Sequence, residues 1–158
     1  MSVGIVLIGT GAHAHKLWLY ARLVGLHVRA FVDESPGASS PAPGIPCLVP
    51  MEAAKFPAWQ RFLVAIGNAS ARRIHHEKYV SQGWTPIVLI HPTAYVAVDA
   101  QVGLGSVVCA NAVVESRSVI GVACIVGIGV PVDHDCVVGD YSHLTLGTVL
   151  LPYSRFPQ

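Results

Sequence analysis

Charged residues are scarce in this chain: they make up 12% of its 158 residues, and the formal net charge is +1. That balance offers no basic surface for a nucleic acid and no acidic tail. Long apolar runs are also missing, because stretches such as Ile87–Ile90 and Cys124–Val132 are short or broken by Gly and Pro. A membrane-spanning helix needs roughly 20 such residues. We also expect no secretory signal at the N-terminus, because Gly9 interrupts the run Val3–Ile8.

Cysteine pairs of the CxxC type are absent too. The four cysteines lie far apart and come with no secretory context: Cys47, Cys109, Cys124 and Cys136. We therefore expect reduced, structural thiols in a cytoplasmic protein that contacts neither membrane nor nucleic acid. Apolar residues are plentiful instead, at 53% of the chain, which is enough to bury a core.

The first half of the chain alternates strand-like and helix-like segments. The loop Glu34–Pro50, which holds five prolines, separates two groups of them. This order predicts a small three-layer α/β domain up to about Leu89. The predicted strands are Val3–Ile8, His27–Val32, Arg61–Ile66 and Ile87–Ile90, and the predicted helices are Ala14–Val24 and Ala69–Val80, with Asn68 as the N-cap of the second.

The second half has a period of six. Aliphatic residues recur at every sixth position, and a small or moderate residue follows four positions after each. A helix would leave this register, because its 3.6-residue period does not fit six over many turns. A solenoid fits it, with each six-residue repeat, or hexad, forming a short strand and a corner. The predicted inward residues are Ile90, Val96, Val102, Val108, Val114, Ile120, Val126, Val132, Val138, Leu144 and Leu150.

Four motifs, in order, resemble the hexapeptide-repeat sugar acetyltransferases of the PglD/NeuD type. They are Gly9-Thr-Gly-Ala-His-Ala14, Phe31-Val-Asp-Glu34, Ala65-Ile-Gly-Asn68 and Val132-Asp-His-Asp-Cys-Val-Val-Gly-Asp140. The resemblance covers the chain up to about Thr148. It implies a Rossmann-like, sugar-nucleotide-binding domain over residues 1–89 and a left-handed parallel β-helix with three hexads per coil over residues 90–158. It also implies a homotrimer with active sites between neighbouring subunits.

The residues just before the inward positions agree with such an assembly. Val107, Val113, Val119 and Ile125 are expected to point outward and to form an apolar surface. A monomer should not expose such a surface.

The loop Gly9-x-Gly11-x-x-Ala14 lies between a predicted strand and helix, and Asp33 follows about 20 residues on. This context favours a dinucleotide site, with phosphate at the helix N-terminus, and taken alone it favours a nicotinamide cofactor. His13 and His15 form an HxH pair, but two histidines without further ligands are a poor metal site. We expect no metal.

The resemblance redirects the loop to a nucleotide-linked sugar. It implies sugar-nucleotide contacts at Gly11, Ala12, His13, Asp33, Glu34 and Gly67. It further implies that His134 is the general base, that Asp135 raises its basicity, and that His143 contacts acetyl-coenzyme A. In a strand with strictly alternating side chains, Val132 and His134 would point to the same face. Because Val132 is expected to point inward and His134 outward, we expect His134 at or near a corner. His75 and His76, in a polar helix, are expected to be solvated.

Two departures from the family pattern separate the possible functions. Gly127-Ile128 stands where the family has Asn-Thr, and Pro152 stands where a glycine N–H contacts the acetyl carbonyl; proline has no N–H. The repeat is expected to dissolve after Pro152, as in a C-terminally shortened relative. The leading hypothesis is acetyl-CoA-dependent N- or O-acetylation of a nucleotide-linked sugar in glycan biosynthesis. The alternatives are a relative that binds the sugar nucleotide with little acetyl transfer, and an NAD-binding oxidoreductase.

Overall fold

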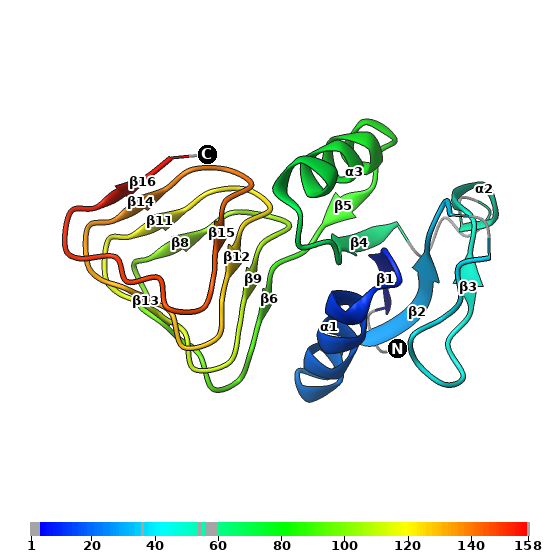
Figure 1. Cartoon of the computed structure of the whole chain (residues 1–158), viewed down its shortest axis with the longest axis horizontal. Helices are drawn as coiled ribbons and strands as arrows, with labels where there is room; N and C mark the ends of the chain where they lie inside the picture. Colours follow the sequence, from blue (N-terminus) through cyan, green and yellow to red (C-terminus); the bar gives the residue numbers. More distant parts are fainter. Residues whose placement is uncertain (1–3, 36, 54, 56–59, 158) are drawn as a thin grey trace. The chain divides into compact units, whose positions relative to one another are not determined.

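The computed structural model describes residues 4–35, 37–53, 55 and 60–157. Of the residues in the predictions above, Val3, Pro36 and Gln158 lie outside this range. The chain divides into two compact units, residues 1–87 and residues 88–158 (Figure 1). No helix in the described part of the chain is long and apolar enough to cross a bilayer.

The first unit is built on a five-stranded, all-parallel sheet with the strand order β3-β2-β1-β4-β5. Helix α1 packs on β1 and β2, and α3 packs on β4 and β5. The strands are β1 Gly4–Ile8, β2 His27–Val32, β3 Cys47–Leu48, β4 Arg61–Val64 and β5 Thr85–Pro86, and the helices are α1 Ala12–Leu23, α2 Pro50–Ala53 and α3 Ala69–Ser81. The strand order reverses direction between β1 and β4, which is where doubly wound sheets bind ligands.

Most of the predicted elements of this unit are confirmed. Asn68 caps α3, with its Oδ1 accepting the Ala71 N–H at 2.9 Å. One prediction was wrong in part: the last strand of this sheet is β5 Thr85–Pro86, whereas within the predicted strand Ile87–Ile90 only Leu89–Ile90 forms a strand, and it belongs to the second unit. The proline-rich loop contains the short strand β3, which pairs with β2 at the edge of the sheet. Two-residue edge strands carry no periodic signal and tolerate proline, so the sequence could not reveal them.

The second unit is a parallel β-helix with three flat sides (Figure 1). Each side is a sheet of two-residue parallel strands that are 18 residues apart, so three hexads make one coil. The sheets are β13-β10-β7, β16-β14-β11-β8 and β15-β12-β9-β6. The strands are β6 Leu89–Ile90, β7 Tyr95–Val96, β8 Gln101–Val102, β9 Val107–Val108, β10 Val113–Val114, β11 Val119–Ile120, β12 Ile125–Val126, β13 Pro131–Val132, β14 Val137–Val138, β15 His143–Leu144 and β16 Arg155–Phe156.

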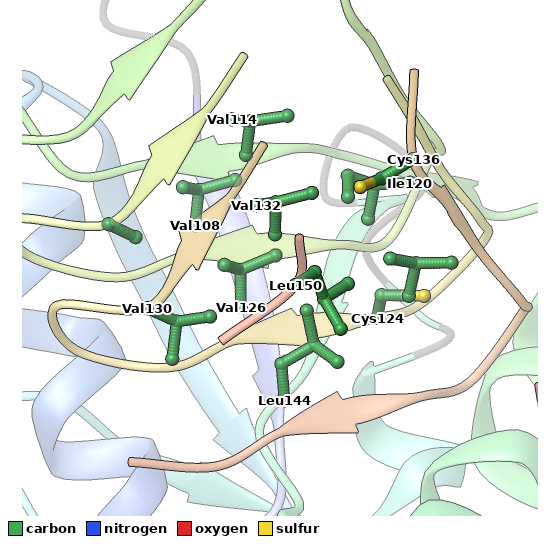
Figure 2. Packing of buried hydrophobic residues seen from close by; sticks show 12 residues of the cluster. Val108, Val114, Ile120, Cys124, Val126, Val130, Val132, Cys136, Leu144 and Leu150 are labelled. Atoms are coloured by element: carbon green, nitrogen blue, oxygen red, sulfur yellow. The ribbon is translucent and has the colours of Figure 1, made fainter. Parts of the chain in front are cut away.

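The predicted inward residues form the core of the coil (Figure 2). Those from Val108 to Leu150 are buried, and Ile90, Val96 and Val102 pack against them half-buried. The prediction that the repeat dissolves after Pro152 was wrong, since β16 continues the sheet beside β14. Phe156 stands six residues after Leu150, in the inward register, and packs against the core.

The outward apolar residues differ from one side of the coil to another. Val113 is half-buried and Val119 is 36% exposed, whereas Val107 and Ile125 are each 1% exposed. Val107 and Ile125, on the sheet that contains β9 and β12, are therefore already buried in one chain and are not part of an exposed apolar surface. These four residues occupy the same position in their hexads, but their strands belong to three different sides of the coil. Their surroundings therefore differ.

Glycine is required where successive coils approach most closely. A Cβ on Gly103 would lie 2.5 Å from the Gly121 carbonyl oxygen, and one on Gly127 would lie 2.5 Å from the Leu144 carbonyl oxygen. Both distances are far below van der Waals contact. Gly127 is therefore not a free position that lost an asparagine, because any side chain there needs a local shift of the backbone.

Candidate active site

A depression at the carboxyl ends of β1, β2 and β4 gathers most of the predicted substrate residues. Gly11, Ala12, His13, Asp33 and Gly67 line it together. Glu34 lines its continuation between Ile8 and Tyr79. The order of the parallel strands produces this meeting, because the loops after adjacent strands all open at the same edge.

Asp33 is held rigidly in this depression. Thr10 Oγ1 donates to Asp33 Oδ2 at 2.7 Å, and the Ser35 N–H donates to Asp33 Oδ1 at 2.9 Å. Partial burial acts to raise the pKa of Asp33, but these hydrogen bonds outweigh it and hold the pKa below its usual value. Asp33 thus presents an ionised carboxylate that can accept further hydrogen bonds from a hydroxyl or amine.

Glu34 points to a different partner. Lys78 Nζ pairs with Glu34 Oε1, and this hydrogen bond lowers the pKa of Glu34. Both groups are partly exposed, so the pair adds little to stability. The ion pair matters locally. Glu34 is bound by the Lys78 ammonium, whereas the hydrogen bonds to Asp33 come from the neutral groups of Thr10 and Ser35.

The loop after β4 is tied down by a buried arginine. Arg72, 1% exposed, donates from Nη1 to the carbonyl oxygens of Ile66 and Gly67 at 3.0 and 2.7 Å. Nη1 can satisfy both carbonyls at once because it carries two N–H groups. The Gly67 side of the depression is therefore preformed.

His75 and Tyr79 belong to this depression, although the sequence analysis did not place them there. They stand one helical turn apart on α3, and both line the depression. Tyr79 is 1% exposed, and its ring packs on Phe62 and Trp84 at centroid distances of 5.5 and 5.1 Å. Among the described residues, neither Tyr79 Oη nor His75 Nδ1 has a hydrogen-bond partner. A ligand is the natural partner for such buried polar atoms.

The expectation of solvated helix histidines was consequently wrong. His76 is 5% exposed and contacts the Phe62 ring, with centroids 5.8 Å apart, and His75 is half-buried. The polar composition of α3 hid a face that packs on the sheet. Burial also raises the pKa of Tyr79 to about 12, so its hydroxyl keeps its proton and serves as a donor.

In the solenoid, His134 lies in the turn between β13 and β14, so its predicted corner position is confirmed. Its Nδ1 lies 2.6 Å from Asp135 Oδ2, and its ring meets the Tyr153 ring edge-on at 5.3 Å. The pKa of Asp135 is held well below its usual range, first by the hydrogen bonds from Arg117 and then by the one from His134. An ionised carboxylate only accepts, so Nδ1 carries a proton, and in the neutral imidazole Nε2 then keeps a lone pair.

His143 lies half-buried in β15, on another side of the coil from β13. Its predicted role in contacting acetyl-CoA remains a prediction. Within the described residues, no three His, Cys, Asp or Glu side chains are grouped so as to hold a metal ion.

The comparisons with known proteins follow the same two units. The family of the PglD N-terminal domain matches residues 4–79. The acetyltransferase domain of PglB from Neisseria gonorrhoeae, solved with acetyl coenzyme A, is 30% identical at a TM-score of 0.87, and the match covers 98% of this chain and 76% of that one. This chain belongs to the PglD-type family of sugar acetyltransferases.

Further solved structures extend the likeness. PerB from Caulobacter crescentus, solved with CoA and GDP-perosamine, is 27% identical at a TM-score of 0.86, with 98% of this chain and 83% of that chain covered. WeeI from Acinetobacter baumannii is 15% identical at a TM-score of 0.68, covering 97% and 92%, which shows the common fold alone. The PglD-type fold is thus present over both units of the chain.

The small residues of the solenoid explain how the His134 corner is held in this PglD-type chain. Ser118 Oγ donates to the Asp133 carbonyl at 2.6 Å and accepts the Cys136 N–H at 3.1 Å. Ser106 repeats the arrangement elsewhere in the coil, bonding the Gly121 carbonyl at 2.8 Å and the Cys124 N–H at 2.9 Å. One buried hydroxyl thereby fixes the backbone on both sides of His134.

We expect Ser118→Ala to lower the free energy of unfolding by about 1–3 kcal/mol, because it strands a buried carbonyl and a buried N–H. Urea unfolding measures this. Ser106→Ala is the matched control and should destabilise the chain by a similar amount. Under conditions in which both variants remain folded, only Ser118→Ala should also reduce acetyl transfer. Equal activity losses in the two variants would contradict a specific role at the His134 corner.

Proposed function

We propose that this chain transfers the acetyl group of acetyl-CoA to an amino or hydroxyl group of a nucleotide-linked sugar. The observation that carries the proposal is the His134–Asp135 pair at a solenoid corner, at 2.6 Å, in a chain that belongs to a family of sugar acetyltransferases. The accompanying depression in the first unit supplies the Asp33 carboxylate and the buried polar atoms of His75 and Tyr79 for the sugar nucleotide.

The chemistry needs one base. The acceptor nitrogen or oxygen attacks the thioester carbonyl carbon, and His134 Nε2 removes the proton that the acceptor loses. The tetrahedral intermediate then collapses, the carbon–sulfur bond breaks, and the imidazolium returns the proton to the coenzyme A thiolate. Asp135 remains ionised and holds the imidazole in the tautomer that this sequence requires.

The further assignments follow the family. Gly11, Ala12, His13, Asp33, Glu34 and Gly67 contact the nucleotide sugar, and His143 contacts acetyl-CoA. His75 and Tyr79 join the first group on structural grounds, because both line the same depression. An amino sugar is the favoured acceptor, since the related PerB was solved with GDP-perosamine. The active assembly is a homotrimer.

The second candidate function is sugar-nucleotide binding with little transfer. Pro152 favours it, because it has no N–H to offer at the position where the family contacts the acetyl carbonyl. Losing one oxyanion donor costs on the order of 10²–10³ in rate.

One set of measurements separates these functions. Calorimetry is run with UDP- and GDP-linked amino sugars, with acetyl-CoA and with NAD, and thiol release from acetyl-CoA is followed in parallel. The proposed enzyme binds a sugar nucleotide and acetyl-CoA, and it releases thiol only when the acceptor is present. Sugar-nucleotide binding without thiol release would leave the second candidate. Binding of NAD alone would reject both.

A further inference from the structure

Residues one coil apart form a column at the corner that carries His134. Arg117, Asp135 and Tyr153 differ by 18 positions, and each has a left-handed backbone with φ of +57°, +58° and +64°. Neighbouring strands in such a stack lie roughly 4.8 Å apart, so side chains from equivalent corners lie one above another. The geometry of the repeat therefore places Arg117 next to Asp135.

The contact between them is a two-pronged ion pair. Arg117 Nε donates to Asp135 Oδ1 and Nη2 donates to Oδ2, both at 2.7 Å. Asp135 Oδ2 also receives the hydrogen bond from His134 Nδ1 at 2.6 Å. One carboxylate oxygen thus serves both Arg117 and His134, and the fork fixes the plane in which that oxygen lies.

We propose that Arg117 is a positioning residue for acetyl transfer: it orients the Asp135 carboxylate toward His134 and limits how strongly that carboxylate holds a proton on His134. The inference rests on the proposed function, in which His134 is the general base. A general base that binds its proton too tightly is mostly protonated near neutral pH and cannot accept another proton. Because the charge of Arg117 partly offsets that of Asp135, it keeps His134 able to accept the proton of the acceptor.

Three further charged or titratable groups face this corner. Asp133 Oδ1 accepts the His134 backbone N–H at 2.7 Å, and the Tyr153 ring lies against the imidazole from the next coil. Asp99, one coil before Arg117, acts on the guanidinium from the opposite direction. All three remain in an Arg117 variant, so a change in the titration of the corner reports on Arg117 itself.

Arg117→Gln removes both the charge and the fork, whereas Arg117→Lys keeps the charge and loses the fork. We expect the acid limb of the pH–kcat/KM profile of Arg117→Gln to move to higher pH by about half a unit. At neutral pH its kcat should fall roughly tenfold through loss of orientation. Arg117→Lys should keep the acid limb near that of the original chain while kcat still falls. Arg73→Gln, which breaks the exposed pair with Glu77 on α3, is the control and should change neither.

The imidazole can also be titrated directly, by following the His134 ring protons in NMR spectra with His134→Asn for assignment. This readout needs no turnover, so it separates the two failures. If the original chain releases no thiol with any acceptor, the proposed function fails and the NMR titration still decides the role of Arg117. NMR titration curves of the original chain and Arg117→Gln that superimpose would overturn the inference. The Arg117 side chain is 61% exposed, so both variants should fold, and circular dichroism melts verify this.

Discussion

Replacing His134 by alanine should reduce acetyl transfer by about 10²–10⁴-fold, because general-base catalysis contributes that much when the base is well placed. The surroundings of His134 suit the proposed role of general base: Asp135 holds Nδ1, the Tyr153 ring confines the imidazole, and Ser118 fixes the backbone before it. Thiol release from acetyl-CoA at saturating acceptor measures the loss. Binding of the sugar nucleotide, followed by calorimetry, should stay the same, because its depression belongs to the first unit.

His91→Ala is the matched control for this substitution. His91 is another histidine of the solenoid unit, and its Nδ1 is engaged locally by the Thr93 hydroxyl at 2.9 Å. Its loss should leave the transfer rate unchanged. If His134→Ala retained more than about a tenth of the rate, or if His91→Ala fell equally far, another residue would have to act as the base.

The solenoid is the part of this chain that the sequence specifies most completely. A period of six that is sustained without a break fixes which side chain of every hexad points inward, and the structure places them there. Once three hexads per coil are accepted, the position of any residue on a corner or a side follows by arithmetic. The same arithmetic extends the repeat to Phe156, which was overlooked because the aromatic residue and the nearby prolines masked the register.

The column of residues at the His134 corner could also be predicted from the 18-residue period of the coil. Adding and subtracting 18 from Asp135 gives Tyr153 and Arg117. What the sequence could not supply is the conformation of the corner. Non-glycine residues adopt a left-handed backbone only where the surrounding structure enforces it, and this conformation decides that the guanidinium meets the carboxylate.

The depression at the ends of β1, β2 and β4 was predictable in part. Gly11, Asp33 and Gly67 follow predicted parallel strands, so their loops had to meet at one edge of the sheet. His75 and Tyr79 come from a helix whose polar composition favoured a solvated face. Their spacing of four was a usable signal, but it acquires meaning only when the tilt of α3 over the sheet is known.

Asp33 is the pocket residue whose loss should affect substrate binding most. We expect Asp33→Asn to weaken binding of the sugar nucleotide by about 10–100-fold, because a hydrogen bond to a charged group contributes roughly 1.5–3 kcal/mol. Asparagine keeps the size of the side chain and one acceptor oxygen for Thr10, but it loses the charge. The dissociation constant from calorimetry measures the effect. KM should rise with little change in kcat, because a contact made equally in the ground and transition states affects binding alone.

Glu77→Gln tests whether charge alone explains such a result. Glu77 lies on α3 beside the depression's helix residues, yet it is 52% exposed and pairs with Arg73. Removing its charge changes the net charge of the chain as Asp33→Asn does, but Glu77 does not itself line the depression. Affinity should therefore hold in Glu77→Gln and fall in Asp33→Asn. A loss below about twofold in Asp33→Asn, or equal losses in both variants, would move the sugar-nucleotide site away from the ends of β1, β2 and β4, because a direct charged contact is worth more than that.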